Sequence, residues 1–156
     1  MKKIFFLALF AVALTSNFSN AQSKSGFGIG IIIGEPTGVS FKSWLDSKSA
    51  IDGAAAWSFV NNGSFHVHAD YLRHSNLEST SGGELNFHYG IGGRLKAKSN
   101  NSSDDARIGA RIPLGIDYNF TSEPLELFLE VAPVLDFTPK TDFTFNGAIG
   151  IRYYLH

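Results

Sequence analysis

The sequence predicts an all-β protein: one antiparallel sheet of eight strands, closed into an up-and-down barrel. After residue 26, almost every segment alternates between two kinds of residue with a period of two, which is typical of strands. Clusters of Gly, Pro, Asn, Asp and Ser separate these segments, as expected of turns. No segment shows a sustained helical period, so we expect no helix and no transmembrane helix in the mature chain.

The N-terminus has the layout of a secretory signal peptide. A basic start precedes an apolar run over 4–14, and the small residue Ala21 ends the polar stretch that follows. We therefore expect cleavage after Ala21. This divides the chain into a signal peptide over 1–21 and a single barrel domain over 22–156.

The composition excludes several classes of protein. The chain has 13 basic and 14 acidic residues and a net charge of -1, so it lacks the basic excess of a nucleic-acid-binding protein. It contains no cysteine, which excludes a disulfide framework, a thiolate metal site and a cysteine nucleophile. We expect no cofactor and no nucleic-acid partner.

The alternation divides the mature chain into eight strands. They are expected over 26–34, 38–46, 50–59, 65–71, 84–96, 107–120, 125–137 and 143–155. The connection over 72–83 is longer than most of the others. Pro113 and Pro133 fall inside strands, and since proline has no N–H, each needs a bulge or a local break.

The two faces of these strands differ in chemistry. One face is apolar and carries no charge, whereas the other carries every strand charge and many glycines and alanines. The interior of an eight-stranded barrel is just wide enough for its own side chains, and large apolar residues would overfill it. We therefore expect an apolar exterior that faces lipid and a charged lumen, which is the pattern of a transmembrane barrel.

The charges of the lumen are expected to pair, since an unpaired buried charge is unfavourable. Strands that alternate in direction predict the pairs Arg111–Glu130 and Arg152–Glu126. Such a network would plug the lumen, so we expect a closed, structural barrel without an open aqueous pore. The network is expected to comprise Asp70, Arg94, Arg111, Asp117, Glu126, Glu130, Asp136 and Arg152.

Three histidines, His66, His68 and His88, also lie on the lumen face. If the intervening hairpin centres near Ser79, His88 lies opposite Asp70. Imidazoles beside a carboxylate can bind a metal such as zinc. They can equally form hydrogen bonds within a polar lumen, and this simpler interpretation is favoured, so we assign no metal or catalytic residue.

Aromatic residues gather near the two ends of the predicted strands. This placement resembles the interfacial girdles of membrane barrels, although aromatic residues also favour strands in general. One group comprises Phe59, Phe65, Phe137 and Phe143; the other comprises Phe27, Tyr71, Tyr118, Phe120 and Tyr153.

The last strand resembles the C-terminal assembly signal of bacterial outer-membrane barrels, because Gly150 is followed by Tyr153 and Leu155. It differs in ending on Leu155-His156, where many such proteins end on Phe. Further segments resemble a family of small, uncharacterised eight-stranded outer-membrane barrels of the OmpA membrane type. They are the GEPTG at 34–38, HADYL at 68–72, YGIGGR at 89–94 and LFLEVAP at 127–133.

That resemblance implies a fold and an outer-membrane location and brings no established activity. The expected partners are outer-membrane lipids and the barrel-assembly machinery, which would engage the C-terminal strand. We expect a monomer.

Two other functions stay open. A soluble exported barrel that binds a small apolar ligand would require the two faces to be exchanged. A membrane-embedded lipid-modifying enzyme would explain His74-Ser75-Asn76, which resembles the histidine–serine motif of lipid A deacylases. That chemistry needs both side chains together as base and nucleophile, whereas adjacent strand residues point to opposite faces. We expect no enzymatic activity.

Overall fold

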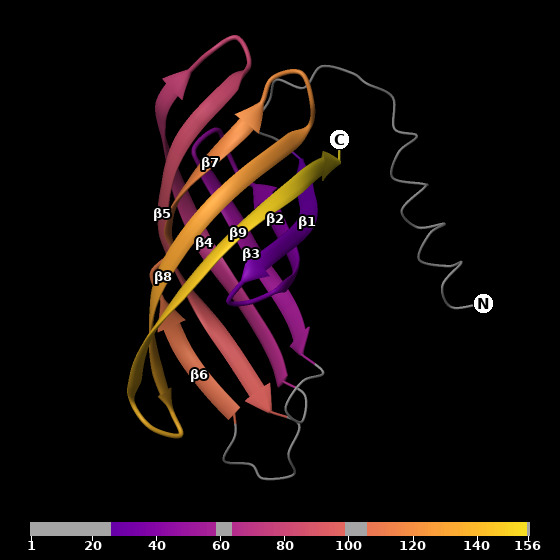
Figure 1. Ribbon diagram of the computed structural model, residues 1–156. Helices are drawn as coiled ribbons and strands as arrows, with labels where there is room; N and C mark the ends of the chain where they lie inside the picture. The colour runs from indigo at the N-terminus through magenta and orange to yellow at the C-terminus, as the bar shows by residue number, and fades with distance from the viewer. Residues whose placement is uncertain (1–25, 59–63, 99–105, 156) are drawn as a thin grey trace, which may run out of the picture.

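The computed structural model describes residues 26–58, 64–98 and 106–155, and the expected signal peptide lies outside them. Within these ranges the chain is all-β, and nine strands form one antiparallel sheet (Figure 1). None of the described residues belongs to a helix that could cross a membrane. The strands are β1 (Phe27–Gly34), β2 (Gly38–Trp44), β3 (Ser49–Ser58), β4 (Ser64–Ser79), β5 (Gly83–Lys98), β6 (Ala106–Arg111), β7 (Leu114–Phe120), β8 (Leu125–Thr138) and β9 (Asp142–Leu155).

Every strand pairs with neighbours on both sides. The order is β4-β3-β2-β1-β9-β8, then β6 and β7, then β5, and β5 pairs in turn with β4. The pairing therefore returns to the strand from which it starts. The first and last strands pair from Phe27 opposite Leu155 to Gly34 opposite Ala148. The β4–β5 hairpin and the end of β9 lie at one end of the sheet, and the β8–β9 turn lies at the other (Figure 1).

The segment 107–120, expected as one strand, is divided into β6 and β7 at Ile112 and Pro113. The carbonyl of Pro113 accepts a hydrogen bond of 3.0 Å from Gly90 on β5. Because N–H and C=O of a residue point the same way in an antiparallel pair, the nitrogen of Pro113 also faces β5, where it has no hydrogen to donate. The ladder is interrupted there, as a proline inside a strand requires.

Pro133 faces the same interruption from the other side. Its carbonyl accepts a hydrogen bond of 3.0 Å from the N–H of Ile112. Pro133 has no N–H, and its nitrogen faces the gap between β6 and β7, where the ladder is already broken. β8 therefore runs through Pro133 without a break. Since β6 and β7 both lie between β5 and β8, together they take the place of one expected strand.

The connection expected over 72–83 is wrong. β4 continues to Ser79, and only 80–82 join it to β5. From Tyr71 to Ser75 the residues still alternate in burial, so that His74 is buried and Ser75 is exposed, whereas 76–79 are all exposed. The alternation is hidden in the sequence because both faces of this segment carry polar side chains.

Burial divides the sheet into two chemically different faces. Each of the nine strands exposes at least one large hydrophobic side chain, and all of those exposed except Leu77 lie on the face predicted to be apolar. The opposite face is buried and holds charged residues together with small ones such as Ala50 and Ala54. The inside of this sheet is therefore packed mainly with polar groups.

Candidate functional site

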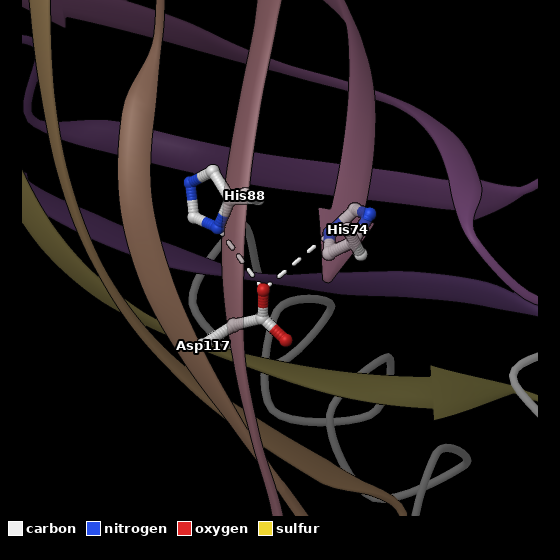
Figure 2. A group of neighbouring side chains, drawn as sticks. All are labelled: His74, His88 and Asp117. Atoms are coloured by element: carbon white, nitrogen blue, oxygen red, sulfur yellow. Dashed lines mark hydrogen bonds and ion pairs between the residues drawn. The ribbon is translucent and has the colours of Figure 1, made fainter. Parts of the chain in front are cut away.

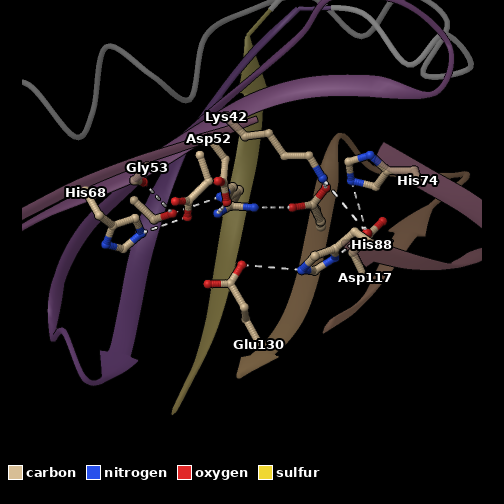
Figure 3. A network of polar contacts seen from close by, with 12 residues as sticks. Lys42, Asp52, Gly53, His68, His74, His88, Asp117 and Glu130 are labelled. Atoms are coloured by element: carbon tan, nitrogen blue, oxygen red, sulfur yellow. Dashed lines mark hydrogen bonds and ion pairs between the residues drawn. The ribbon is translucent and has the colours of Figure 1, made fainter. Parts of the chain in front are cut away.

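A network of charged side chains fills the buried side of the sheet (Figure 3). Lys42 and Asp52, which were absent from the predicted network, belong to it, and so does His74. Alternation along the strands turns these side chains inward. The predicted members are all buried, namely Asp70, Arg94, Arg111, Asp117, Glu126, Glu130, Asp136 and Arg152, as are His66, His68 and His88.

Arg111 on β6 joins carboxylates from two other strands. Its Nε lies 3.0 Å from Oδ2 of Asp70 on β4, and its Nη2 donates to Glu130 on β8. The Arg111–Glu130 contact is one of the two pairs expected from the strand directions. A guanidinium is well suited to this position because its fixed fork of donors can serve two anions.

Arg152 on β9 plays a similar role closer to the β4–β5 hairpin. Its Nη1 donates to Glu126 at 2.7 Å, which is the second expected pair, and its Nη2 donates to Asp52 at 2.8 Å. The guanidinium also stacks on Phe128, with 3.8 Å between its carbon and the ring centroid. Asp52 lies opposite Asp70 across β3 and β4, and the two arginines neutralise one carboxylate each.

Arg94 on β5 forms the network's most complete hydrogen-bonding set at the other end. It makes two parallel bonds to Asp136, of 3.0 Å from Nε and 2.6 Å from Nη2. It also donates to Asn146 and Thr144, both at 3.1 Å.

Exposed ion pairs follow at the edge of this end. Lys96 donates to Glu35 at 3.0 Å, and this hydrogen bond lowers the pKa of the Glu35 carboxyl in the turn between β1 and β2. Arg107 lies 3.3 Å from Asp142. Pairs of this exposed kind contribute little to stability.

Two histidines meet Asp117 near the β4–β5 hairpin (Figure 2). His88 Nδ1 lies 3.0 Å from Oδ1 of Asp117, and His74 Nε2 lies 3.4 Å from the same oxygen. All three side chains are buried. Lys42 Nζ lies 4.0 Å from this oxygen, while its hydrogen bond of 2.8 Å goes to Glu126. We call His74, His88 and Asp117 the His–Asp cluster.

His88 lies opposite His74. The expectation from the sequence, that it lies opposite Asp70, is wrong. The hairpin turns over 80–82 rather than near Ser79, which moves the partner of His88 toward the hairpin, and a bulge between Asn76 and Glu78 moves it back by one residue, to His74. His74 was missed because it was placed in a connection. Its even numbering, shared with His66, His68 and Asp70, was the signal that it points inward.

A second group of potential ligands comprises His68, Asp70 and Glu130. His68 Nε2 lies 3.8 Å from Asp70, but Arg111 already forms ion pairs with both carboxylates of this group. His66 and His68 contact each other through their rings, with centroids 5.6 Å apart. Among the described residues, therefore, the His–Asp cluster is the better candidate for a ligand site.

His74 and Ser75 do not form a base–nucleophile pair in this geometry. His74 is buried beside Asp117, whereas Ser75 is exposed on the opposite face of β4. The serine hydroxyl is thus separated from the imidazole by the sheet itself.

The fold and this network define a class of protein: an all-β antiparallel sheet with an apolar exposed face and a buried face of paired charges. The chain belongs to a family of proteins of unknown function, DUF3996, whose sequence model matches residues 18–154. No curated protein and no solved structure matches the chain.

Proposed function

We propose that this protein is a small integral protein of a bacterial outer membrane, folded as a closed β-barrel with a structural role. The observation that carries the proposal is the exposure of large hydrophobic side chains on every strand, on the face opposite the charges. A continuous apolar surface of this kind is unfavourable in water and suits a hydrocarbon environment. A soluble ligand-binding barrel needs its apolar residues around an internal cavity.

The pairing of the strands supports closure. β4 pairs with both β3 and β5, and β1 pairs with both β2 and β9. With β6 and β7 counted as one interrupted strand, the sheet becomes a barrel of eight. A closed sheet satisfies its backbone groups internally, which is the main requirement of a protein segment in lipid.

Strand length also supports insertion. β4 and β5 have 16 residues each, and β8 and β9 have 14 each, whereas about 9–11 residues cross a bilayer at a tilt. β1 and β2 are shorter, with 8 and 7 residues. An eight-stranded barrel has room inside for little more than its own side chains, so the paired charges close the lumen.

The location and partners follow from the sequence. The signal-peptide pattern favours export, and the pattern of Gly150, Tyr153 and Leu155 on β9 favours recognition by the barrel-assembly machinery. Outer-membrane lipids would surround a monomer. The ion pairs of the described residues form within one chain.

Cell fractionation with electrophoresis of boiled and unboiled samples tests this proposal. We expect the protein in the outer-membrane fraction and a change of gel mobility on boiling, since folded barrels migrate differently from unfolded chains. Recovery as a soluble periplasmic protein with no such change would contradict membrane insertion and favour a ligand-binding role.

Recordings across a planar lipid bilayer test the closed lumen. We expect no steady conductance from the purified protein under conditions in which a general porin conducts. A large, stable single-channel current would show that the charged network leaves a water-filled path, and the structural role would have to be replaced by a transport role.

A further inference from the structure

We propose that the His–Asp cluster is a binding site for one divalent transition-metal ion of the zinc class. The ligands would be Nε2 of His74, Nδ1 of His88 and Oδ1 of Asp117. The three residues come from β4, β5 and β7, and each offers a ligand atom within 4.8 Å of those of the other two. The inference concerns the interior of the sheet and does not depend on membrane insertion.

The two distances from Asp117 to the histidine nitrogens are close to those of a coordination polyhedron. Oδ1 of Asp117 lies 3.0 Å from His88 Nδ1 and 3.4 Å from His74 Nε2. In a tetrahedral zinc site with bonds of about 2.0–2.1 Å, neighbouring ligand atoms lie roughly 3.3–3.4 Å apart. Two imidazoles and a carboxylate are donors that zinc and its neighbours in the first transition series accept.

The outer contacts orient each ligand. His74 Nδ1 lies 3.3 Å from the carbonyl of Lys48, and since a carbonyl only accepts, Nδ1 must carry the hydrogen. In the neutral imidazole, Nε2 then presents its lone pair to Asp117. Nε2 of His88 lies 3.4 Å from Glu130 (Figure 3). A backbone carbonyl and a carboxylate in these positions are the usual outer partners of metal-bound histidines.

Asp117 is held in the same manner. Its Oδ2 accepts hydrogen bonds from Asn86 at 3.1 Å and from Asn119 at 2.7 Å. These two amides fix the carboxylate so that Oδ1 faces the two imidazoles (Figure 2). One oxygen is therefore engaged in positioning, and the other is directed into the cluster.

With neutral imidazoles, some ring nitrogens of the cluster face carboxylate oxygens with no hydrogen between them, and a bound cation would remove this repulsion. Nε2 of His74 is buried and makes no hydrogen bond, although it lies beside a carboxylate oxygen. His88 has carboxylate oxygens beside both ring nitrogens, and a neutral imidazole has only one N–H to donate. One metal ion bound by both histidines removes both acceptor–acceptor contacts and leaves His88 Nε2–H to face Glu130.

The charges of the buried network favour the same conclusion. The described buried residues include six carboxylates and four side chains with a permanent positive charge, so the carboxylates outnumber the buried cations by two when the histidines are neutral; the half-exposed Arg107 adds a cation 3.7 Å from Asp136 at the far end. One divalent ion balances this excess. The alternative is two added protons, carried by the two imidazoles, whose rings lie 5.6 Å apart near the Lys42 ammonium, or in part by a carboxylate such as Asp70, which lies opposite Asp52. The six carboxylates belong to Asp52, Asp70, Asp117, Glu126, Glu130 and Asp136; the four cations are Lys42, Arg94, Arg111 and Arg152.

Cobalt(II) provides a direct probe, because Trp44 contacts His74 with 4.4 Å between ring centroids. The protein has two tryptophans, so the Trp57→Phe variant isolates the fluorescence of Trp44. We expect Co²⁺, present during refolding of this variant, to quench the fluorescence of Trp44 at one ion per chain. The bound Co²⁺ should also show the visible absorption bands that are typical of a low coordination number. Zn²⁺ should displace it and restore the fluorescence.

Substitutions in the same background locate the site. His74→Gln and His88→Gln should each weaken Zn²⁺ binding by roughly a hundredfold or more, and Glu130→Gln, outside the ligand set, by about 10–100-fold. His66→Gln removes another buried histidine and should leave affinity and stoichiometry unchanged. Circular dichroism of each variant reports whether it folds.

Two results would overturn the proposal. One is a folded parent protein that binds neither Co²⁺ nor Zn²⁺, which means that protons balance the cluster. The other is binding that survives in folded His74→Gln and His88→Gln or that is lost in His66→Gln, which places the ion elsewhere. The first can be read from the parent protein alone, even where a variant fails to fold.

Discussion

Arg94 and Asp136 form a bidentate, fully buried ion pair between β5 and β8, with bonds of 3.0 and 2.6 Å. The two strands are not direct partners at this level, because β6 lies between them. The pair therefore ties the sheet together across its buried side.

Breaking this pair should be strongly destabilising. We expect Arg94→Met or Asp136→Leu alone to lower the free energy of unfolding by about 3–5 kcal/mol, because each leaves a buried charge without its bidentate partner. In Arg94→Met, Asp136 keeps only the half-exposed Arg107, at 3.7 Å. The double variant should lose much less than the sum, since it removes both charges. Urea titrations of the refolded protein measure all three values. Additive losses would show that the two side chains do not interact in the folded state.

The membrane proposal makes a separate prediction about Ile149, which lies near the middle of β9 with 57 % of its surface exposed. Ile149→Arg should destabilise the protein in lipid bilayers by about 2–4 kcal/mol, the cost of an arginine at the bilayer midplane. Ser47→Arg, in the exposed β2–β3 turn, is the control and should have little effect. If Ile149→Arg is neutral and improves solubility without detergent, the apolar face is in contact with water.

Much of this fold could be predicted from the alternation of residue types. The face of the charged residues and the pairs Arg111–Glu130 and Arg152–Glu126 required only strand direction and a period of two. The β4–β5 hairpin could not be predicted, because a segment that is polar on both faces has no visible period, and His74 was lost with it. The turn over 80–82 placed His88 away from the partner expected for it, and the bulge after Asn76 set its register opposite His74.

Lys42 and Asp52 illustrate a different limit. Both were recognised as charges on the inward face, yet nothing in the sequence shows which inward charges meet. Lys42 reaches Glu126, 84 positions along the chain, because β2 and β8 face each other across the interior without sharing a ladder. Such contacts depend on the curvature of the whole sheet rather than on neighbouring strands.

Asp46 gives a prediction about pH. Its carboxyl accepts hydrogen bonds from the backbone N–H groups of Lys48 at 2.7 Å and Ser49 at 2.8 Å, and these lower its pKa from the ordinary value of 3.8. A carboxyl whose pKa is lower in the folded state stabilises that state at any pH above its pKa in the unfolded chain. This stabilisation is lost as the pH falls through the pKa of the folded state. NMR titration of the side chain measures the shift. Asp46→Asn should remove this part of the acid dependence, and an unchanged dependence would contradict the assignment.

Gly115 is expected to be required for the position of His88. A Cβ added there would lie 2.5 Å from His88 Nε2 and would also meet the backbone of β8 at Leu129. Gly115→Ala should therefore destabilise the protein by about 1–3 kcal/mol through overpacking and should weaken metal binding. Gly147→Ala is the matched control, since a Cβ at that position meets nothing within 4 Å. Equal stability and equal metal affinity of the two variants would contradict this packing.

Lys42 is predicted to limit the affinity of the His–Asp cluster for a metal. Its ammonium lies 4.0 Å from Oδ1 of Asp117, so it repels any cation bound to that oxygen. Lys42→Met keeps most of the side-chain volume and removes the charge, and we expect Zn²⁺ affinity to rise by about tenfold or more. Glu126 keeps Arg152 and the hydroxyl of Tyr154, at 2.8 Å, as partners in this variant. Competition with a fluorescent chelator measures the change. If the affinity stays constant or falls in the folded variant, the ion does not bind at Asp117, since an ion bound to that carboxylate would be repelled by the nearby Lys42 ammonium.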